Sequence, residues 1–239
     1  MPRYKVRPVD RLPGAVHCAA VQELELPMAR ALELAWESLR AGSLGVGATV
    51  SRHGEVIATG RNRMAERDPG DDVLAGSSLA HAEMNALAQL RWGTRADGLE
   101  LWTTLQPCIQ CLGAIRLSPV PKVHALAPDP LFRGIERIRE VNEFVGRRWP
   151  EIVEVRTDRW AALSLLLHTH FVTFWGVTLD GWDTALPSIA GLAHQLVDSG
   201  ELIHLAAEAA PLAEVATALW DRLDACVPDV ARLASVSPA

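Results

Sequence analysis

The chain has 239 residues, of which 49% are hydrophobic and 22% are charged, and its formal net charge is −6. This composition is ordinary for a globular protein, and a chain of this length can bury a substantial core. The longest apolar stretches, such as 161–167, are far too short to span a membrane, and no apolar run follows the first residues. We therefore expect a cytoplasmic protein with no membrane partner.

The charge is unevenly distributed along the chain. From residue 157 to the end, three arginines, no lysine and ten acidic residues give −7, which leaves about +1 for residues 1–156. Proteins that bind a phosphate backbone usually carry a dense basic stripe, and neither part has one. No nucleic-acid partner is expected.

Apolar spacing and turn residues predict alternating helices and strands as far as residue 156, and mainly helices after it. The segment 61–77 is long enough to be a functional surface loop. We predict an α/β fold: a three-layer α/β/α sandwich around a mixed sheet, with a mainly helical C-terminal extension. The core is placed at 1–156 and the extension, packed on it, at 157–239. Helices are predicted over 27–40, 79–92, 107–117, 135–145, 160–171, 186–197 and 211–225, and strands over 45–52, 56–60, 99–105, 122–127 and 152–155.

Four residues with metal-binding or acid–base chemistry lie near predicted helix starts. His81 and Glu83 would point about 200° apart in the middle of a helix, so they converge only on a site beside its first turn. The helix-start signal at 77–78 predicts that position. Cys108 and Cys111 share one face at the start of the next predicted helix, where the positive helix end favours thiolates.

One imidazole and two thiolates are three ligands, one fewer than a closed structural zinc site has. A three-ligand site leaves a position for water, whose pKa a zinc ion lowers to about 7. Glu83 is the candidate carboxylate for proton transfer. A redox-active cysteine pair and a structural zinc site are the alternatives, and the order and spacing of His81, Glu83, Cys108 and Cys111 favour catalytic zinc.

The motif His81-Ala82-Glu83, followed by Pro107-Cys108-Ile109-Gln110-Cys111, resembles the H-x-E…P-C-x-x-C signature of the cytidine deaminase-like superfamily. The resemblance covers roughly residues 25–156. It is closest to the branch of guanine, cytosine, deoxycytidylate and tRNA adenosine deaminases.

This resemblance implies that Zn²⁺ is held by His81, Cys108 and Cys111 and that Glu83 moves protons. It also implies substrate contacts from Asn62 and Ala82, and a homodimer or larger homo-oligomer; Asn62 could alternatively be a turn residue. The expected function is zinc-dependent hydrolytic removal of an exocyclic amino group from a small-molecule nucleobase or nucleoside. A tRNA adenosine deaminase and a zinc-stabilised scaffold without activity are the alternatives, and the presence of Glu83 disfavours the scaffold.

Three features depart from the pattern of these relatives. Gln106 replaces a glutamate, the gap between Asn62 and His81 is longer, and the C-terminal extension exceeds the minimal fold. His168 and His170 in the extension are expected to pack and form hydrogen bonds, with a second metal site as the alternative. Asp129 and Phe132, after a predicted strand, are candidates for recognising or stacking on a base.

Overall fold

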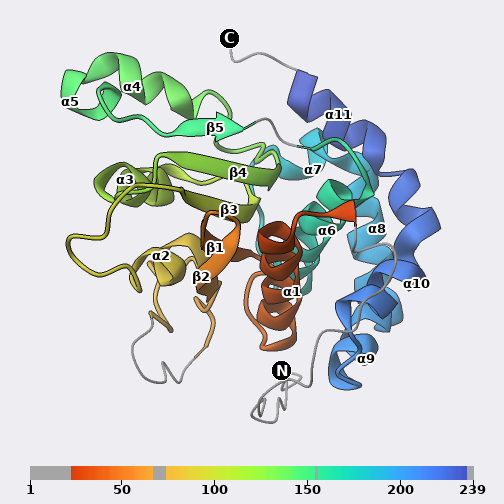
Figure 1. Ribbon diagram of the computed structural model, residues 1–239. Coiled ribbons are helices and arrows are strands. Elements are labelled where there is room, and N and C mark those ends of the chain that lie inside the picture. The colour runs from red at the N-terminus through yellow and green to blue at the C-terminus, as the bar shows by residue number, and fades with distance from the viewer. Residues whose placement is uncertain (1–22, 67–73, 154–155, 236–239) are drawn as a thin grey trace.

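A five-stranded mixed sheet lies at the centre of the molecule (Figure 1). The computed structural model describes residues 23–66, 74–153 and 156–235. The strand order is β2-β1-β3-β4-β5, with β1 antiparallel to β2 and β3, and β4 parallel to β3 and β5. The predicted mixed sheet is therefore confirmed. The strands are β1 (Gly47–Arg52), β2 (Glu55–Arg61), β3 (Leu99–Leu105), β4 (Lys122–Ala127) and β5 (Glu151–Val153).

Helices cover both faces of the sheet, α1 and α6 on one and α2 and α3 on the other (Figure 1). The C-terminal helices pack outside α1 and α6. The result is the predicted α/β sandwich with a mainly helical C-terminal part. The helices are α1 (Leu26–Arg40), α2 (Ala82–Leu87), α3 (Ile109–Leu117), the 3₁₀ helix η2 (Ile135–Arg137), α4 (Ile138–Val141), α5 (Glu143–Gly146), α6 (Arg159–Phe174), α7 (Trp182–Ala185), α8 (Pro187–Ser199), α9 (Glu201–Ala207), α10 (Leu212–Asp224) and α11 (Val227–Ser235).

Two glycines in the first hairpin bring helices to backbone contact on opposite faces. A Cβ atom on Gly47 would lie 2.0 Å from the carbonyl oxygen of Ala31 in α1. A Cβ atom on Gly60 would lie 2.1 Å from the carbonyl oxygen of Ala82 in α2. Any side chain at these positions would push the helices away from the sheet. Gly60 thus sets the position of the first residue of α2, next to His81.

The hydrophobic core continues from the sheet into the C-terminal helices. Trp36 of α1 and Trp160 and Leu166 of α6 are almost fully buried in the same cluster. The indole N–H of Trp36 also donates a 2.7 Å hydrogen bond to the carbonyl oxygen of Ala210. Burial of side chains this large contributes about 1.5–3 kcal/mol each. The domain boundary near residue 156 stays a prediction, but the residues after it share their core with the sheet.

Several predicted elements differ from the observed ones. The helix predicted over 79–92 is the short α2, and Trp92, whose apolar character extended the prediction, is fully exposed. The helix predicted from Pro107 begins at Ile109. The helix predicted over 135–145 is interrupted at Asn142, whose extended backbone and side-chain oxygen cap α5. The segment after residue 156 forms α6 through α11 rather than the three predicted helices.

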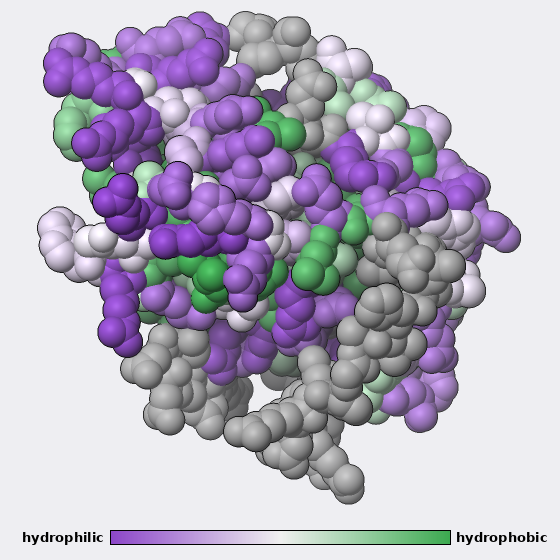
Figure 2. All heavy atoms as spheres, in the orientation of Figure 1, coloured by the Kyte–Doolittle hydropathy of each residue, from purple (hydrophilic) through white to green (hydrophobic). Residues whose placement is uncertain are grey.

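Hydrophilic side chains dominate much of the face drawn in Figure 2, especially over α4 and α5 at the upper left. The apolar groups on this face are small and separated from one another. Within 23–66, 74–153 and 156–235, no helix combines the length and apolar character that crossing a membrane requires. Part of the predicted loop 61–77 lies outside these ranges.

Candidate active site

The predicted metal ligands lie at the starts of two adjacent helices. His81 is the N-cap residue of α2, with an extended backbone (φ −73°, ψ 157°), and Cys108 is the N-cap residue of α3. Cys111 lies in the first turn of α3. The extended backbone at His81 lets its side chain and that of Glu83 converge. The predicted convergence beside a helix start is thus observed, although both helices begin later than predicted.

The side chains of His81, Cys108 and Cys111 form a compact group of possible metal ligands. Their ligand atoms all lie within 4.8 Å of one another. The Nδ1 atom of His81 is 3.6 Å from Sγ of Cys108 and 3.5 Å from Sγ of Cys111, and the two sulfur atoms are 3.6 Å apart. Ligands arranged tetrahedrally around zinc at normal bond lengths would be about 3.5–3.8 Å apart. The three donor atoms therefore fit one zinc ion.

The two thiols favour a single negative charge between them. The hydrogen bond between the sulfur atoms lowers the pKa of Cys108 to about 4, and the hydrogen bond to His81 acts in the same direction. The same hydrogen bond and burial raise the pKa of Cys111. A divalent cation among these atoms would favour the second thiolate by neutralising the charge. The donor set is thus suited electrostatically to a cation.

Glu83 is buried beside the ligand group, with only 3% of its surface exposed. One carboxylate oxygen lies 3.4 Å from Sγ of Cys111, and the other is 3.1 Å from the hydroxyl group of Thr103 in β3. Burial raises the pKa of Glu83 above its usual range. The carboxyl group is therefore placed to hold or release a proton at the edge of the ligand group. The contact with Thr103 was missed by the sequence analysis.

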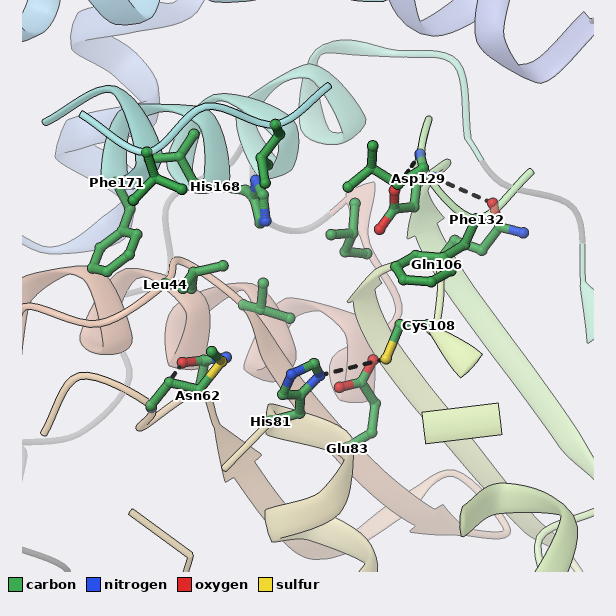
Figure 3. A pocket seen from close by; sticks show the side chains of 17 residues that line it. Leu44, Asn62, His81, Glu83, Gln106, Cys108, Asp129, Phe132, His168 and Phe171 are labelled. Carbon is green, nitrogen blue, oxygen red and sulfur yellow. Dashed lines mark hydrogen bonds between the residues drawn. The ribbon is translucent and has the colours of Figure 1, made fainter. Parts of the chain in front are cut away.

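A cavity of about 300 Å³ opens above these residues (Figure 3). His81, Glu83 and Cys108 line one side of it. The end of β3, Gln106 and the segment after β4 contribute another side. Helix α6 and the segment after it close the cavity opposite the ligand group. The other labelled residues in Figure 3 are Leu44, Asn62, Gln106, Asp129, Phe132, His168 and Phe171.

Asn62 lines the cavity with its amide group in a fixed orientation. Its Oδ1 atom accepts hydrogen bonds from the hydroxyl group of Ser43 (2.8 Å) and the backbone N–H of Met64 (3.1 Å). Because both bonds occupy the oxygen, the amide NH₂ group is left as the donor. Ala82, the other predicted substrate contact, is fully buried and is not among the cavity-lining residues. A contact from Ala82 would have to come from its backbone.

Asp129 places a carboxyl group in the cavity wall at the end of β4. Its Oδ1 atom accepts a 2.8 Å hydrogen bond from the backbone N–H of Leu131. Burial raises the pKa of Asp129 to about 7. Gln106 accepts a 3.2 Å hydrogen bond from the backbone N–H of Asp129 through its side-chain oxygen. The glutamine that departs from the pattern of the relatives thus supports the backbone of this wall.

Two side chains of α6, His168 and Phe171, also line the cavity. Packing and hydrogen bonding were expected for His168, with a second metal site as the alternative. Both are buried, with 7% and 9% of their surfaces exposed, but they face the cavity as well as the core (Figure 3). Nothing in the local sequence distinguishes these two situations.

Comparisons with known proteins identify the same region of the chain. Residues 21–127, which include His81, Glu83, Cys108 and Cys111, match the family described as the cytidine and deoxycytidylate deaminase zinc-binding region. A tRNA-specific adenosine deaminase of Streptococcus pyogenes serotype M1 is 28% identical over 127 residues, which are 51% of this chain and 68% of that protein. The corresponding protein of Aquifex aeolicus is 36% identical over 109 residues, 44% of this chain and 66% of the relative.

Among solved structures, guanine deaminase from Bacillus subtilis is 31% identical, with a TM-score of 0.37. The similarity covers 44% of this chain and 64% of that chain. This chain therefore spans about two thirds of the length of the relatives that it matches, and its C-terminal helices lie outside the matched family region.

Proposed function

Because the chain belongs to the cytidine deaminase-like superfamily of zinc-dependent hydrolases, which act on carbon–nitrogen bonds, we propose that it deaminates a small-molecule nucleobase or nucleoside. The observation that carries the proposal is the cavity of about 300 Å³, which α6 closes over Glu83 and the metal-ligand group. Cavities of this size enclose small ligands and surround most of their surface.

His81, Cys108 and Cys111 would hold one zinc ion in this proposal. Bound there, zinc supplies a Lewis acid that makes water a better nucleophile at neutral pH. Glu83 takes a proton from the attacking water and returns protons to a ring nitrogen and then to the departing amino group. The water oxygen forms a bond to the amino-bearing carbon and the carbon–nitrogen bond breaks, so a carbonyl product and ammonia result. The raised pKa of Glu83 suits both acceptance and return of a proton.

Other polar groups in the cavity would orient the heterocycle. The NH₂ group of Asn62 is available as a donor, and the backbone of Ala82 lies between His81 and Glu83. The carboxyl group of Asp129 can accept from an N–H group when ionised and can donate when protonated. Its pKa of about 7 makes both forms accessible near neutral pH.

A tRNA adenosine deaminase is the second candidate, and the names of the curated relatives favour it. These relatives do not support the expectation of no nucleic-acid partner. The charge of the chain favours the small-molecule candidate, because residues 157–239 sum to −7 and would repel phosphates. Arginines over α4 and α5 alternate with acidic residues, and Arg147 forms a 2.5 Å ion pair with Glu143. A homodimer or larger assembly stays a prediction.

Parallel assays on the purified protein distinguish the two candidates. Ammonia release is measured with adenine, guanine, cytosine, their nucleosides and triazine analogues, with Glu83→Gln as the inactive control. Inosine formation and binding by fluorescence anisotropy are measured with a tRNA anticodon stem-loop at several salt concentrations. We expect ammonia release from at least one small molecule and no tRNA conversion. Conversion of the stem-loop, with micromolar binding that weakens with salt, would establish the second candidate instead.

A further inference from the structure

A histidine of the C-terminal extension faces the proposed substrate from the wall opposite the metal-ligand group. His168 comes from α6, lines the cavity and is 7% exposed. Its ring points from the helix into the cavity, toward the side where His81 and Glu83 lie (Figure 3). The Nδ1 atom is buried and has no hydrogen-bond partner among the described residues. Because this nitrogen is sealed from the cavity, a ligand there would meet the other ring nitrogen, Nε2.

The orientation of this ring is fixed by its neighbours. The ring of Trp182 stacks on that of His168, with ring centroids 4.5 Å apart and an interplanar angle of 28°. Trp182 is itself held in place, because its indole N–H donates a 2.9 Å hydrogen bond to the hydroxyl group of Thr169. Thr169 in turn donates to the carbonyl oxygen of Leu165, 2.7 Å away. The imidazole is therefore positioned before any ligand enters, as an effective recognition group must be.

The imidazole ring of His168 is neutral near pH 7 because it is buried, and it is not part of the metal-ligand group. Burial lowers the pKa of His168 to about 4. A neutral imidazole offers one donor and one acceptor nitrogen. Within the described ranges, the ligand atoms that cluster within 4.8 Å belong to His81, Cys108 and Cys111, without His168. The ring is thus suited to bind an uncharged polar group rather than the metal.

We propose that His168 is a specificity-determining residue that hydrogen-bonds the edge of the substrate heterocycle remote from the carbon that loses its amino group. Glu83 and the metal ligands act at one side of the cavity, and His168 reaches it from the other side (Figure 3). The preferred substrate therefore has a ring nitrogen, N–H or carbonyl oxygen on that remote edge. This inference rests on the proposed function.

The same helix provides a matched control for a purely structural role. His170 is 1% exposed, and both its ring nitrogens are buried without hydrogen-bond partners in the described part of the chain. It stacks against Phe174 but is not among the cavity-lining residues. Replacing His170 therefore perturbs the packing of α6 without removing a group from the cavity.

The test measures binding separately from turnover. In a Glu83→Gln background, the dissociation constants of adenine, guanine, cytosine and their nucleosides are measured by calorimetry. The probe that binds most tightly is then titrated into variants that also carry His168→Leu, His168→Asn, His168→Gln or His170→Leu. Zinc content and Tm are recorded for each variant. In the active background, KM and kcat for the same compound are compared.

We expect His168→Leu to weaken binding about tenfold or more and to raise KM by a similar factor, because one buried hydrogen bond is lost. His170→Leu should change binding less than about threefold, and His168→Asn or His168→Gln should restore part of the affinity. Equal binding by His168→Leu and His170→Leu would overturn the proposal, as would loss of folded, zinc-containing protein in all three His168 variants. If no probe binds and none is deaminated, the proposed function itself fails, which is a different result.

Discussion

The hydroxyl group of Thr103 lies 3.1 Å from Oε1 of Glu83 and 3.1 Å from the carbonyl oxygen of Leu105. A hydroxyl group has one proton and can donate to only one of them at a time. It can donate to ionised Glu83, or accept from protonated Glu83 while it donates to Leu105. Thr103 can therefore satisfy the carboxyl group in both protonation states, which a residue that moves protons requires.

Thr103→Val should lower kcat about tenfold and leave KM and zinc content nearly unchanged. Valine keeps the shape of threonine but removes a buried hydrogen bond worth roughly 0.5–1.5 kcal/mol, or somewhat more with a charged partner. Steady-state ammonia release is the measurement. Thr103→Ser, which keeps the hydroxyl group, should retain most of the turnover. A fully active Thr103→Val variant would show that the contact does not support Glu83.

Protein purified without added metal should contain one zinc ion per chain. Cys108→Ala and Cys111→Ala should each lose the zinc and lower the Tm, because removal of one ligand leaves only two of the three that fit the ion. Elemental analysis and thermal unfolding check both expectations. Full zinc content in either variant would contradict the proposed ligand set.

Glu83→Gln should keep the zinc content and Tm of the wild-type protein and lose nearly all turnover. General acid–base groups contribute about 10²–10⁴-fold, and a residue used in several proton transfers should reach at least that range. Turnover is measured with the best substrate from the ammonia-release screen. Retention of more than about a tenth of the wild-type rate would rule out the proposed role.

Asp129→Asn should stabilise the protein at alkaline pH. Burial raises the pKa of Asp129 from its usual value near 3.8 to about 7. Below about pH 4 the carboxyl group is protonated in both the folded and the unfolded chain. Between about pH 4 and pH 7 it ionises more readily in the unfolded chain, so the folded protein loses stability as the pH rises through this range. The gain in unfolding free energy from Asp129→Asn should grow between these values to at most about 4 kcal/mol, and the Tm should rise with it. Asp183→Asn, at an exposed position, is the control for thermal unfolding scans.

Truncation after residue 156 should give insoluble or inactive protein. The fully buried side chains of Leu163 and Leu166 would be lost from the shared core, and α1 would lose its neighbour α6. Soluble yield, zinc content and ammonia release measure the effect. A soluble truncation with full activity would show that the extension is dispensable.

The parts of the fold that the sequence predicted best are those with strong local patterns. The strands 99–105 and 122–127 were predicted with their observed bounds, because a proline closely follows each of them, Pro107 and Pro128. The helix predicted over 79–92 was too long because an apolar residue extends a helical pattern whether or not it is buried, and Trp92 is exposed. The break at Asn142 depends on a side-chain cap that helical spacing does not reveal.

That His81, Glu83, Cys108 and Cys111 lie together could be predicted because the spacing within each pair along the chain is short and resembles the family pattern. Thr103 and His168 could not, because their roles depend on contacts between distant segments. Thr103 of β3 forms a hydrogen bond with Glu83 of α2, and His168 lines the cavity from α6, which follows the last strand of the sheet. Periodicity indicates that both are buried, but not whether they face the core or the site.

The helix α6 that closes the cavity is synthesised after all the metal ligands. His81, Cys108 and Cys111 leave the ribosome before any residue of α6, and chains generally begin folding from the N-terminus. The proposed metal ligands are therefore made before the residues that complete the wall of the cavity. The last wall of the cavity depends on the C-terminal part of the chain, which is synthesised last.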